Sequence, residues 1–216
     1  MKAQNAIVLG IGVSVLLTVL AYKTNDLISG TNIKEIQKPL PLNGIKTTEE
    51  RLKIQLYEIK KSINTNSKFN NETAFFIDIK IRSGKNRFFI YDLKTDKLID
   101  EGLVAHGSGS ETQVEGTLKF SNTNNSFCTS LGKYSIENSY VGKFGKAYKL
   151  FGLEATNSNA FDRNIVLHKY SSVPYEEQEV SICNSLGCPM VNEKFYNRIE
   201  KIIDNSKKKI ILNIYY

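Results

Sequence analysis

The sequence is poor in the residues that most often carry nucleophilic or metal chemistry, with two histidines and three cysteines among 216 residues. Thiol and imidazole chemistry is therefore confined to His106, His168, Cys128, Cys183 and Cys188. An odd cysteine count leaves at least one thiol unpaired in an exported chain, which favours a functional thiol. The sequence also lacks a second cysteine pair and a His-x₃₋₅-His pair, so a zinc site is only a weak alternative. We expect no metal and no cofactor.

The chain also lacks a basic stripe interleaved with aromatic residues. Lys and Arg number 29 against 22 Asp and Glu, which gives a net charge of +7. These positive charges are scattered, with one local run at residues 207–209. Nucleic-acid-binding modules gather such charge on one face beside exposed aromatics, so we expect no nucleic-acid partner. We interpret the charge as a solvated basic surface, with attraction to anionic envelope polymers or lipid headgroups as the alternative.

A hydrophobic run, Ala6–Ala21, follows the basic Lys2 near the start of the chain. It is somewhat shorter than the roughly 20 residues that a membrane span needs, and its length is typical of a secretory signal. No clear small-x-small cleavage site follows, so a signal peptide, an uncleaved signal anchor and a buried helix all remain open. We assign residues 1–23 to a signal peptide or signal anchor. The sequence thus predicts a cell-envelope, periplasmic protein, either secreted or anchored in the inner membrane.

The remainder divides by composition into a linker and one domain. Residues 24–46 form a linker rich in polar residues, and residues 47–71 predict a packing helix followed by an Asn-rich breaker. The helix opens with a capping box from Thr47 to Glu50. Residues 72–216 then form the main domain, which is long enough to bury a core of its own.

The residue pattern of this domain predicts a mainly β protein with a few helices, an α+β fold built chiefly on antiparallel strands. No internal repeat is present. Asn192 is expected to cap a helix that carries Phe195 and Ile199. Runs rich in aromatic and branched residues predict strands at 74–81, 88–93, 98–106, 132–137, 147–154, 164–168 and 208–215.

His168 and Cys188 are the best candidates for catalytic residues. A cysteine becomes a useful nucleophile when a neighbouring base lowers its pKa from about 8.5. His168 ends the apolar run 165–167, and a loop brings Cys188 about twenty residues later, so the two can meet if the chain folds back. Taken alone, each residue is more often a satisfied core side chain than a catalytic one.

The residues around Cys188 favour the catalytic interpretation. Gly187 allows a close backbone approach and special dihedral angles, while Pro189 fixes the turn and removes a competing donor. Ser185 can hold the loop or donate a hydrogen bond to a developing charge. In acyl transfer the carbonyl oxygen gains charge, and the N–H groups of Gly187 and Cys188 are candidates to stabilise it. A disulfide between Cys183 and Cys188 is an alternative that would mask this nucleophile.

His106 competes with His168 for the role of base. It precedes the tight segment Gly107-Ser108-Gly109-Ser110, which opens a long polar loop of the kind that lies beside sites. This segment is not a phosphate cradle, because no Gly-Lys-Ser/Thr follows at the required spacing. We predict that His106, Gly107, Ser108, Gly109 and Ser110 bind substrate or support the loop.

The ordered motifs resemble those of the L,D-transpeptidases of the YkuD type, and most closely the murein L,D-transpeptidase catalytic domain branch called YkuD_2. The segment Ile165-Val166-Leu167-His168 resembles the family's segment that ends in a histidine, and Ser185-Leu186-Gly187-Cys188-Pro189 matches its Ser-x-Gly-Cys signature. Similar motifs begin at His106, Phe120, Ser130, Tyr140 and Leu150, so the resemblance covers roughly residues 74–192. The chain departs from better-known members by having Lys169, Leu186 and Met190 where they have Gly, His and Arg.

The resemblance implies a YkuD β-sandwich-like fold, Cys188 as nucleophile and His168 as base. It also implies a peptidoglycan stem peptide as acyl donor, release of D-Ala through a thioester, and a 3-3 cross-link as product. With water as acceptor, the same chemistry would be that of an L,D-carboxypeptidase. Two other hypotheses remain: a non-catalytic peptidoglycan-binding module on the same fold, and a structural protein stabilised by zinc or a disulfide.

Overall fold

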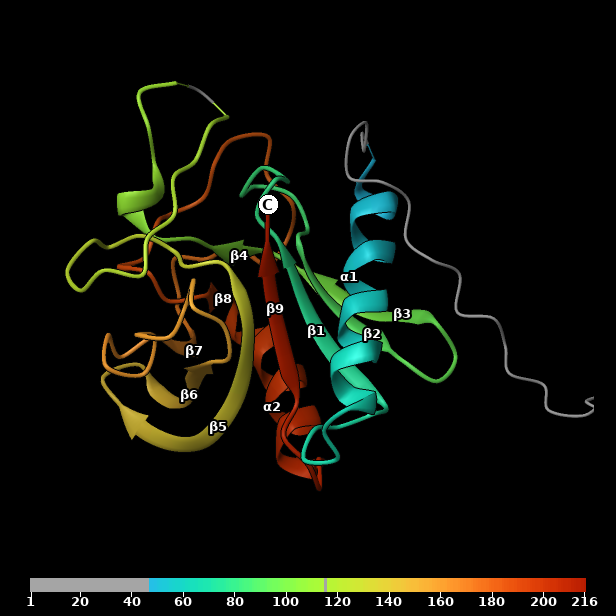
Figure 1. Cartoon of the computed structure of the whole chain (residues 1–216). Coiled ribbons are helices and arrows are strands. Elements are labelled where there is room, and N and C mark those ends of the chain that lie inside the picture. The colour runs from blue at the N-terminus through green and yellow to red at the C-terminus, as the bar shows by residue number, and fades with distance from the viewer. Residues whose placement is uncertain (1–46, 115) are drawn as a thin grey trace, which may run out of the picture. The chain divides into compact units, whose positions relative to one another are not determined.

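The computed structural model describes residues 47–114 and 116–216 (Figure 1). The predicted signal segment 1–23 and the linker 24–46 lie outside these residues. The described chain forms two α-helices, nine strands and one short 3₁₀ helix. In chain order these are α1 (Thr48–Asn64), β1 (Thr73–Asp78), β2 (Phe88–Asp92), β3 (Lys97–Gly102), β4 (Val104–Ala105), η1 (Ser108–Ser110), β5 (Gly132–Gly142), β6 (Gly145–Gly152), β7 (Val166–Lys169), β8 (Met190–Val191), α2 (Glu193–Asn205) and β9 (Ile211–Tyr215).

All nine strands belong to one curled sheet, in the order β3-β2-β1-β9-β5-β6-β7-β8-β4. The pairs β1–β9 and β7–β8 are parallel, and the other pairs are antiparallel. Only Leu103 separates the end of β3 from the start of β4, although these strands are the first and last in the order. The sheet must therefore curl back on itself in a barrel-like way, and Figure 1 shows β3 running on into β4 as one green ribbon.

Helix α1 begins where the sequence predicts and covers the outer face of one part of the sheet (Figure 1). Thr47 accepts a hydrogen bond from the backbone of Glu50, and Glu50 accepts one from the backbone of Thr47, which completes the capping box. The apolar side of α1 packs on β1, β2 and β9 through Leu56, Ile59 and Ile63. This packing anchors the predicted helix to the domain.

Helix α2 fills the inside of the curled sheet and forms the main core with it. Asn192 caps the helix by accepting a hydrogen bond from the backbone of Lys194, as the sequence predicts. Phe195, Tyr196 and Ile199 are buried against inward-facing residues of β1, β2, β5, β6, β7 and β9. Burial of large apolar side chains on both partners provides the chief driving force for holding the helix inside the sheet.

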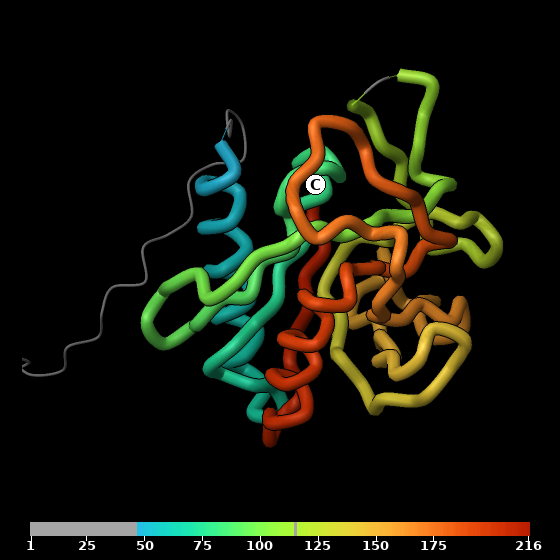
Figure 2. The backbone as a smooth tube through the Cα atoms, turned by 180° about the vertical axis from the view of Figure 1, so that it is seen from behind, coloured from blue at the N-terminus to red at the C-terminus, as the bar shows by residue number. Residues whose placement is uncertain are grey.

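The fold-class prediction of a mainly β domain with a few helices is confirmed. Within residues 47–114 and 116–216, none of the helices has the length and apolar composition to cross a membrane. Figure 2 shows from behind that the loop after β4 and the segment between β7 and β8 approach each other at one end of the sheet. A parallel bridge between Gly107 and Ser185 joins these two segments, and this end of the sheet holds the candidate site.

Candidate active site

Strands β7 and β8 bring the segments of His168 and Cys188 together. The two strands pair in parallel, with His168 opposite Met190. The backbone N–H of His168 donates to the carbonyl oxygen of Pro189 at 3.3 Å. Because Cys188 directly precedes Pro189, residues about twenty positions apart in the sequence become neighbours across one strand pair.

The His168 ring is held in its neutral form. Its Nδ1 lies 2.9 Å from the carbonyl oxygen of Lys169, which can only accept, so Nδ1 carries the proton and Nε2 keeps its lone pair. Burial lowers the pKa of His168 below its ordinary value, and the bond to Lys169 opposes this only in part. The ring of Phe144 stacks on the imidazole with centroids 4.6 Å apart. His168 is therefore oriented and unprotonated at neutral pH.

The Cys188 sulfur is half-buried and protonated in the resting structure. Its thiol donates to the carbonyl oxygen of Asn164 at 3.7 Å. Burial raises the pKa of the Cys188 thiol, while the backbone N–H of Val166 and the positive charge of Arg163 lower it. Within the described residues no hydrogen bond joins the His168 ring to this sulfur. The thiol proton is directed at the Asn164 carbonyl and not at the imidazole, as can occur at catalytic pairs in unliganded proteins.

The loop before Cys188 is rigid and tightly packed. Gly187 has a φ of +115°, and a Cβ on it would lie 3.0 Å from the carbonyl oxygen of Cys128 and 3.1 Å from Ile165 Cδ1. The N–H of Gly187 donates to Ser185 Oγ at 3.0 Å. Ser185 therefore accepts a hydrogen bond within the loop that precedes Cys188, and its role in catalysis stays a prediction. Among the described residues the N–H of Cys188 has no acceptor, so it is the N–H that can bind a developing oxyanion.

His106 lies in a buried network next to this loop. Its Nδ1 accepts from Arg87 at 2.8 Å, and its Nε2 donates to Glu111 Oε1 at 2.8 Å. Both ring nitrogens thus have partners. Burial and the positive charge of Arg87 lower the pKa of His106, and the nearby Glu111 opposes them. Neither ring nitrogen of His106 is therefore left to accept a proton from a thiol.

The segment after His106 is packed against the loop that contains Phe127 and Thr129. The N–H of Gly107 donates to Thr129 Oγ1 at 2.9 Å, and the N–H of Gly109 donates to the carbonyl oxygen of Phe127 at 3.0 Å. Ser110 is fully buried, whereas the Ser108 side chain is exposed. The backbone N–H of Ser108 donates to the Ser185 carbonyl at 2.7 Å, which ties this segment to the Cys188 loop. Substrate binding by residues 106–110 stays a prediction.

Arg163 is a residue of the site that the sequence does not single out. Its guanidinium donates to the carbonyl oxygens of Cys128 at 2.7 Å and Ser121 at 2.9 Å, and to the Ser130 hydroxyl at 3.2 Å. It thereby fastens the polar loop over the site and brings a positive charge near Cys188. In the sequence, Arg163 is marked only by its place shortly before the run that ends at His168, and that place alone does not distinguish it from a surface arginine.

All three cysteines are free thiols, so the alternative disulfide between Cys183 and Cys188 is not formed. The buried Cys128 thiol donates to the carbonyl oxygen of Gly109 at 3.0 Å. Across residues 47–114 and 116–216, no group of three or more His, Cys, Asp or Glu side chains could hold a metal ion. The zinc alternative at Cys183 and Cys188 therefore gains no support from the geometry.

The model of a family described as L,D-transpeptidase catalytic domain matches residues 45–215. No curated protein matches the sequence.

Several solved structures are similar to the chain. An L,D-transpeptidase from Xylanimonas cellulosilytica is 13% identical over 68% of this chain and 61% of its own, with a TM-score of 0.36. One from Stackebrandtia nassauensis is 15% identical over 85% of this chain and 76% of its own, with a TM-score of 0.39. The helical cell shape determining protein Pgp2 from Campylobacter jejuni is 11% identical over 67% of this chain and 48% of its own, with a TM-score of 0.44. The chain thus spans less than two thirds of the length of two of these three structures.

Proposed function

The chain belongs to the L,D-transpeptidase catalytic domain family, and we propose that it is a cysteine acyltransferase acting on peptidoglycan stem peptides through Cys188 and His168. Members of this family are cell-wall enzymes that act on such peptides. The proposal is carried by one observation: the His168 ring, oriented by the Lys169 carbonyl, lies on the strand next to the segment of Cys188. The arrangement supports the proposal because it brings an oriented imidazole onto the strand that neighbours the segment of the thiol.

In the proposed reaction, Nε2 of His168 takes the thiol proton as the sulfur of Cys188 attacks the carbonyl that joins an L-centre to a terminal D-Ala. The C–N bond then breaks, the imidazolium gives its proton to the leaving amine, and D-Ala departs from a thioester. The amine of a second stem peptide attacks this thioester, gives its proton to His168 and releases the sulfur. The product is a 3-3 cross-link, and water as acceptor gives trimming instead.

The backbone of the Cys188 loop supports the oxyanion step of this reaction. Gly187 N–H is bonded to the Ser185 hydroxyl, so the N–H of Cys188 is the donor that remains for the developing charge. A single preorganised donor of this kind is worth roughly 10²–10³-fold in kcat in well-studied acyl-transfer enzymes. The role proposed for Ser185 is to position this loop, and the role proposed for Gly187 is to let it pass close to Cys128.

We further propose that the domain works in the cell envelope, on the outer side of the inner membrane. This placement rests on the apolar run Ala6–Ala21 and on the location of the polymer that carries stem peptides. Anchorage through that run and secretion after its cleavage both place the domain in contact with the wall.

The test uses the purified protein, a stem tetrapeptide as donor, and mass spectrometry. We expect loss of D-Ala and a transient acyl adduct on Cys188. The variant Cys188→Ala should abolish both, whereas Cys183→Ala is a matched control in which a free, half-buried thiol outside the proposed chemistry is removed. If the parent protein shows neither D-Ala loss nor an adduct with several donors, the acyltransferase proposal is wrong and a non-catalytic binding module on the same fold takes its place.

A further inference from the structure

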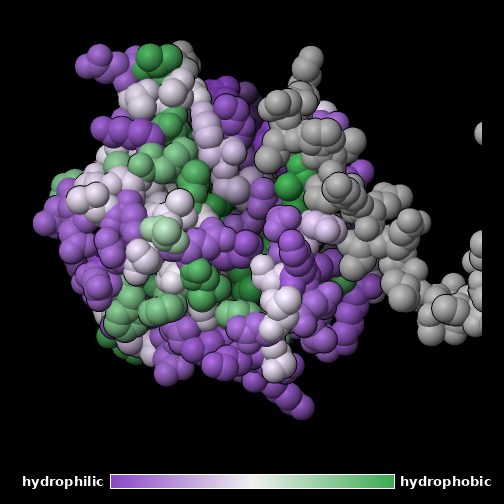
Figure 3. Space-filling view, viewed as in Figure 1, coloured by the Kyte–Doolittle hydropathy of each residue, from purple (hydrophilic) through white to green (hydrophobic). Residues whose placement is uncertain are grey.

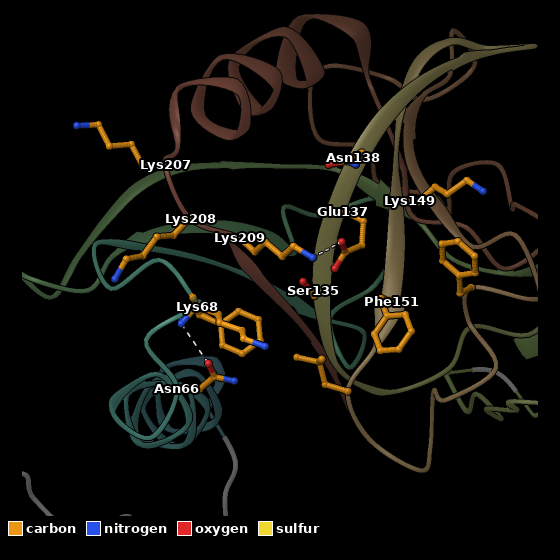
Figure 4. Close-up of a pocket in the computed structure, with 13 residues that line it drawn as sticks. Asn66, Lys68, Ser135, Glu137, Asn138, Lys149, Phe151, Lys207, Lys208 and Lys209 are labelled. Carbon is orange, nitrogen blue, oxygen red and sulfur yellow. Dashed lines mark hydrogen bonds and ion pairs between the residues drawn. The ribbon is translucent and has the colours of Figure 1, made fainter.

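A second candidate site lies on the outer face of β5 and β6, in a cavity of about 810 Å³ (Figure 4). On β6, the buried Leu150 faces the core, so its neighbours Lys149 and Phe151 face outward. On β5, Ser135 pairs with Phe151 and therefore shares this outer face. The cavity is closed by the turn after α1 and by the stretch that leads into β9.

The cavity carries a strong positive charge. Figure 4 shows lysines coming from three segments of the chain: Lys68 from the turn after α1, Lys149 from β6, and residues 207–209 from the stretch before β9. Among the residues that the structure describes, Glu137 is the one carboxylate that lines the cavity, and it forms an ion pair with Lys209. Within the described residues, Lys68, Lys207 and Lys208 have no carboxylate partner. Lysines that lie around the rim of one cavity without carboxylate partners favour an anionic ligand.

The wall of the cavity contains an unpartnered buried hydroxyl. Ser135 is 3% exposed, and its Oγ has no hydrogen-bond partner among the described residues. A buried hydroxyl without a partner costs folding free energy, so such groups call for a ligand or another explanation. Because Ser135 lines the cavity, a bound oxygen or N–H group could satisfy it.

Apolar rings complete the cavity. Phe151 is 48% exposed and Phe161 is 42% exposed, and their ring centroids lie 6.3 Å apart. Figure 3, which draws the molecule in the orientation of Figure 1, shows green apolar patches bordered by purple polar side chains in the lower half of the view. Exposed aromatic faces beside lysines suit a ligand that combines flat apolar surfaces with negative charge, and a sugar ring bearing an acidic group has both.

The cavity is also close to Cys188. The backbone N–H of Asn164 donates to the carbonyl of Phe161 at 3.0 Å, which closes a turn. The ends of such a turn lie within about 7 Å of each other, measured between Cα atoms. Phe161 lines the cavity, and the carbonyl of Asn164 accepts from the Cys188 thiol. The cavity and the thiol thus lie on two sides of one turn.

We propose that this basic cavity binds an acidic cell-wall glycan strand and so holds the polymer while a stem peptide reacts at Cys188. The second half of this statement rests on the proposed function, whereas binding itself does not. The anionic groups would be carboxylates of peptidoglycan or phosphodiesters of a polymer attached to it. The lysines attract these groups, the rings receive the sugar faces, and the Ser135 hydroxyl gains its missing hydrogen bond.

The experiment measures co-sedimentation of the full chain with insoluble peptidoglycan at low and high salt, in a Cys188→Ala background that prevents turnover. The double variant Lys207→Gln/Lys208→Gln should bind at least about ten-fold more weakly at low salt, because each lysine at an anionic surface contributes a several-fold factor. The matched control Lys53→Gln/Lys97→Gln removes the same charge from exposed positions outside the cavity and should retain most of the binding. Equal losses in the two double variants, or no loss in either, would overturn the proposal.

Two further measurements use a Ser135 variant and acid-treated peptidoglycan. Ser135→Ala removes the unpartnered hydroxyl, so it should weaken binding while leaving the free energy of unfolding unchanged or higher. Unchanged binding by this variant would count against a ligand at Ser135. The two sources of negative charge are distinguished with peptidoglycan from which acid has removed the phosphodiester polymers. If the chain still binds this material, carboxylates are the groups that it binds. If binding is lost, phosphodiesters are the groups that it binds. Failure of the parent to process a tetrapeptide would refute the acyltransferase proposal and leave these binding results standing.

Discussion

Replacement of Gly187 by alanine tests how closely the Cys188 loop must approach its neighbours. The φ of +115° is unfavourable for a residue with a side chain, and strain of this kind costs about 1–3 kcal/mol. The new Cβ would also meet the Cys128 carbonyl oxygen at 3.0 Å and Ile165 Cδ1 at 3.1 Å, which is tighter than ordinary packing. Overpacking adds about 1–3 kcal/mol. The free energy of unfolding should therefore fall by roughly 2–6 kcal/mol.

The change is measurable by urea unfolding followed by circular dichroism. A loss of 1 kcal/mol lowers Tm by about 2–4 °C in a protein of this size, so Gly187→Ala should lower Tm by roughly 4–24 °C. Gly116→Ala is the matched control, because Gly116 has a φ of +73° and a Cβ there would meet nothing within 4 Å. Strain alone should cost that variant about 1–2 kcal/mol.

The comparison separates strain from crowding. If Gly187→Ala loses no more stability than Gly116→Ala, the contacts with Cys128 and Ile165 do not constrain the loop, and the argument for a tightly packed site is refuted. If the loss is as large as expected, thiol alkylation at Cys188 should also change, since the strained residue is its immediate neighbour.

The remaining predictions concern charge and pH. Arg163→Gln should raise the pKa of Cys188 and slow its alkylation by iodoacetamide at pH 8 by roughly three- to ten-fold, as expected for loss of a nearby unit charge in a partly solvated site. Arg163→Lys keeps the charge, so its alkylation rate should lie between those of the parent protein and Arg163→Gln. Equal alkylation rates in all three proteins would contradict the electrostatic role of Arg163. Burial holds the pKa of both His106 and His168 below the ordinary value. The unfolded chain therefore binds more protons than the folded one as the pH falls below about 6.5, so the free energy of unfolding should decrease from pH 7.5 to pH 5. In urea titrations, His168→Gln should show a smaller decrease in the free energy of unfolding between pH 7.5 and pH 5 than the parent protein. An equal decrease in the two proteins would show that the fold does not hold the His168 ring of the parent protein neutral.

Local signals in the sequence predicted most of the elements. The capping box at Thr47 fixed the start of α1, and Asn192 fixed the start of α2. Strands with strong apolar runs, such as β1 and β2, were predicted within a few residues. These elements are predictable because their own residues provide the caps, turns and apolar faces that define them.

Pairing between distant segments was harder to predict. β8 has only two residues, Met190 and Val191, and exists because β7 and β4 lie on either side of it. The predicted strand 98–106 is instead divided into β3 and β4, which lie at opposite edges of the sheet order. β5 extends well past its predicted end because its outer half is a polar hairpin arm that shows no alternation. Such features depend on tertiary partners and leave little trace in the local sequence.

The candidate site also contains some residues that the local sequence predicted and others that it could not predict. The pattern around His168 and Cys188 could be identified because motif residues lie close together in sequence. Arg163 and Arg87 could not, since each acts through carbonyl or ring atoms that the fold brings to it. The basic cavity was equally hidden, because the run at 207–209 joins Lys68 and Lys149 only in three dimensions.

The place of β9 in the sheet has a consequence for how a newly made chain matures. This strand follows all the others in sequence, yet it lies between β1 and β5, with Leu212 paired to Phe75. Until Tyr215 has emerged from the ribosome, the two halves of the sheet have no strand to join them. Folding that waits for such distant pairing is slow. Each nascent molecule therefore spends a period as an open chain, accessible to chaperones and to any translocation machinery that requires an unfolded substrate.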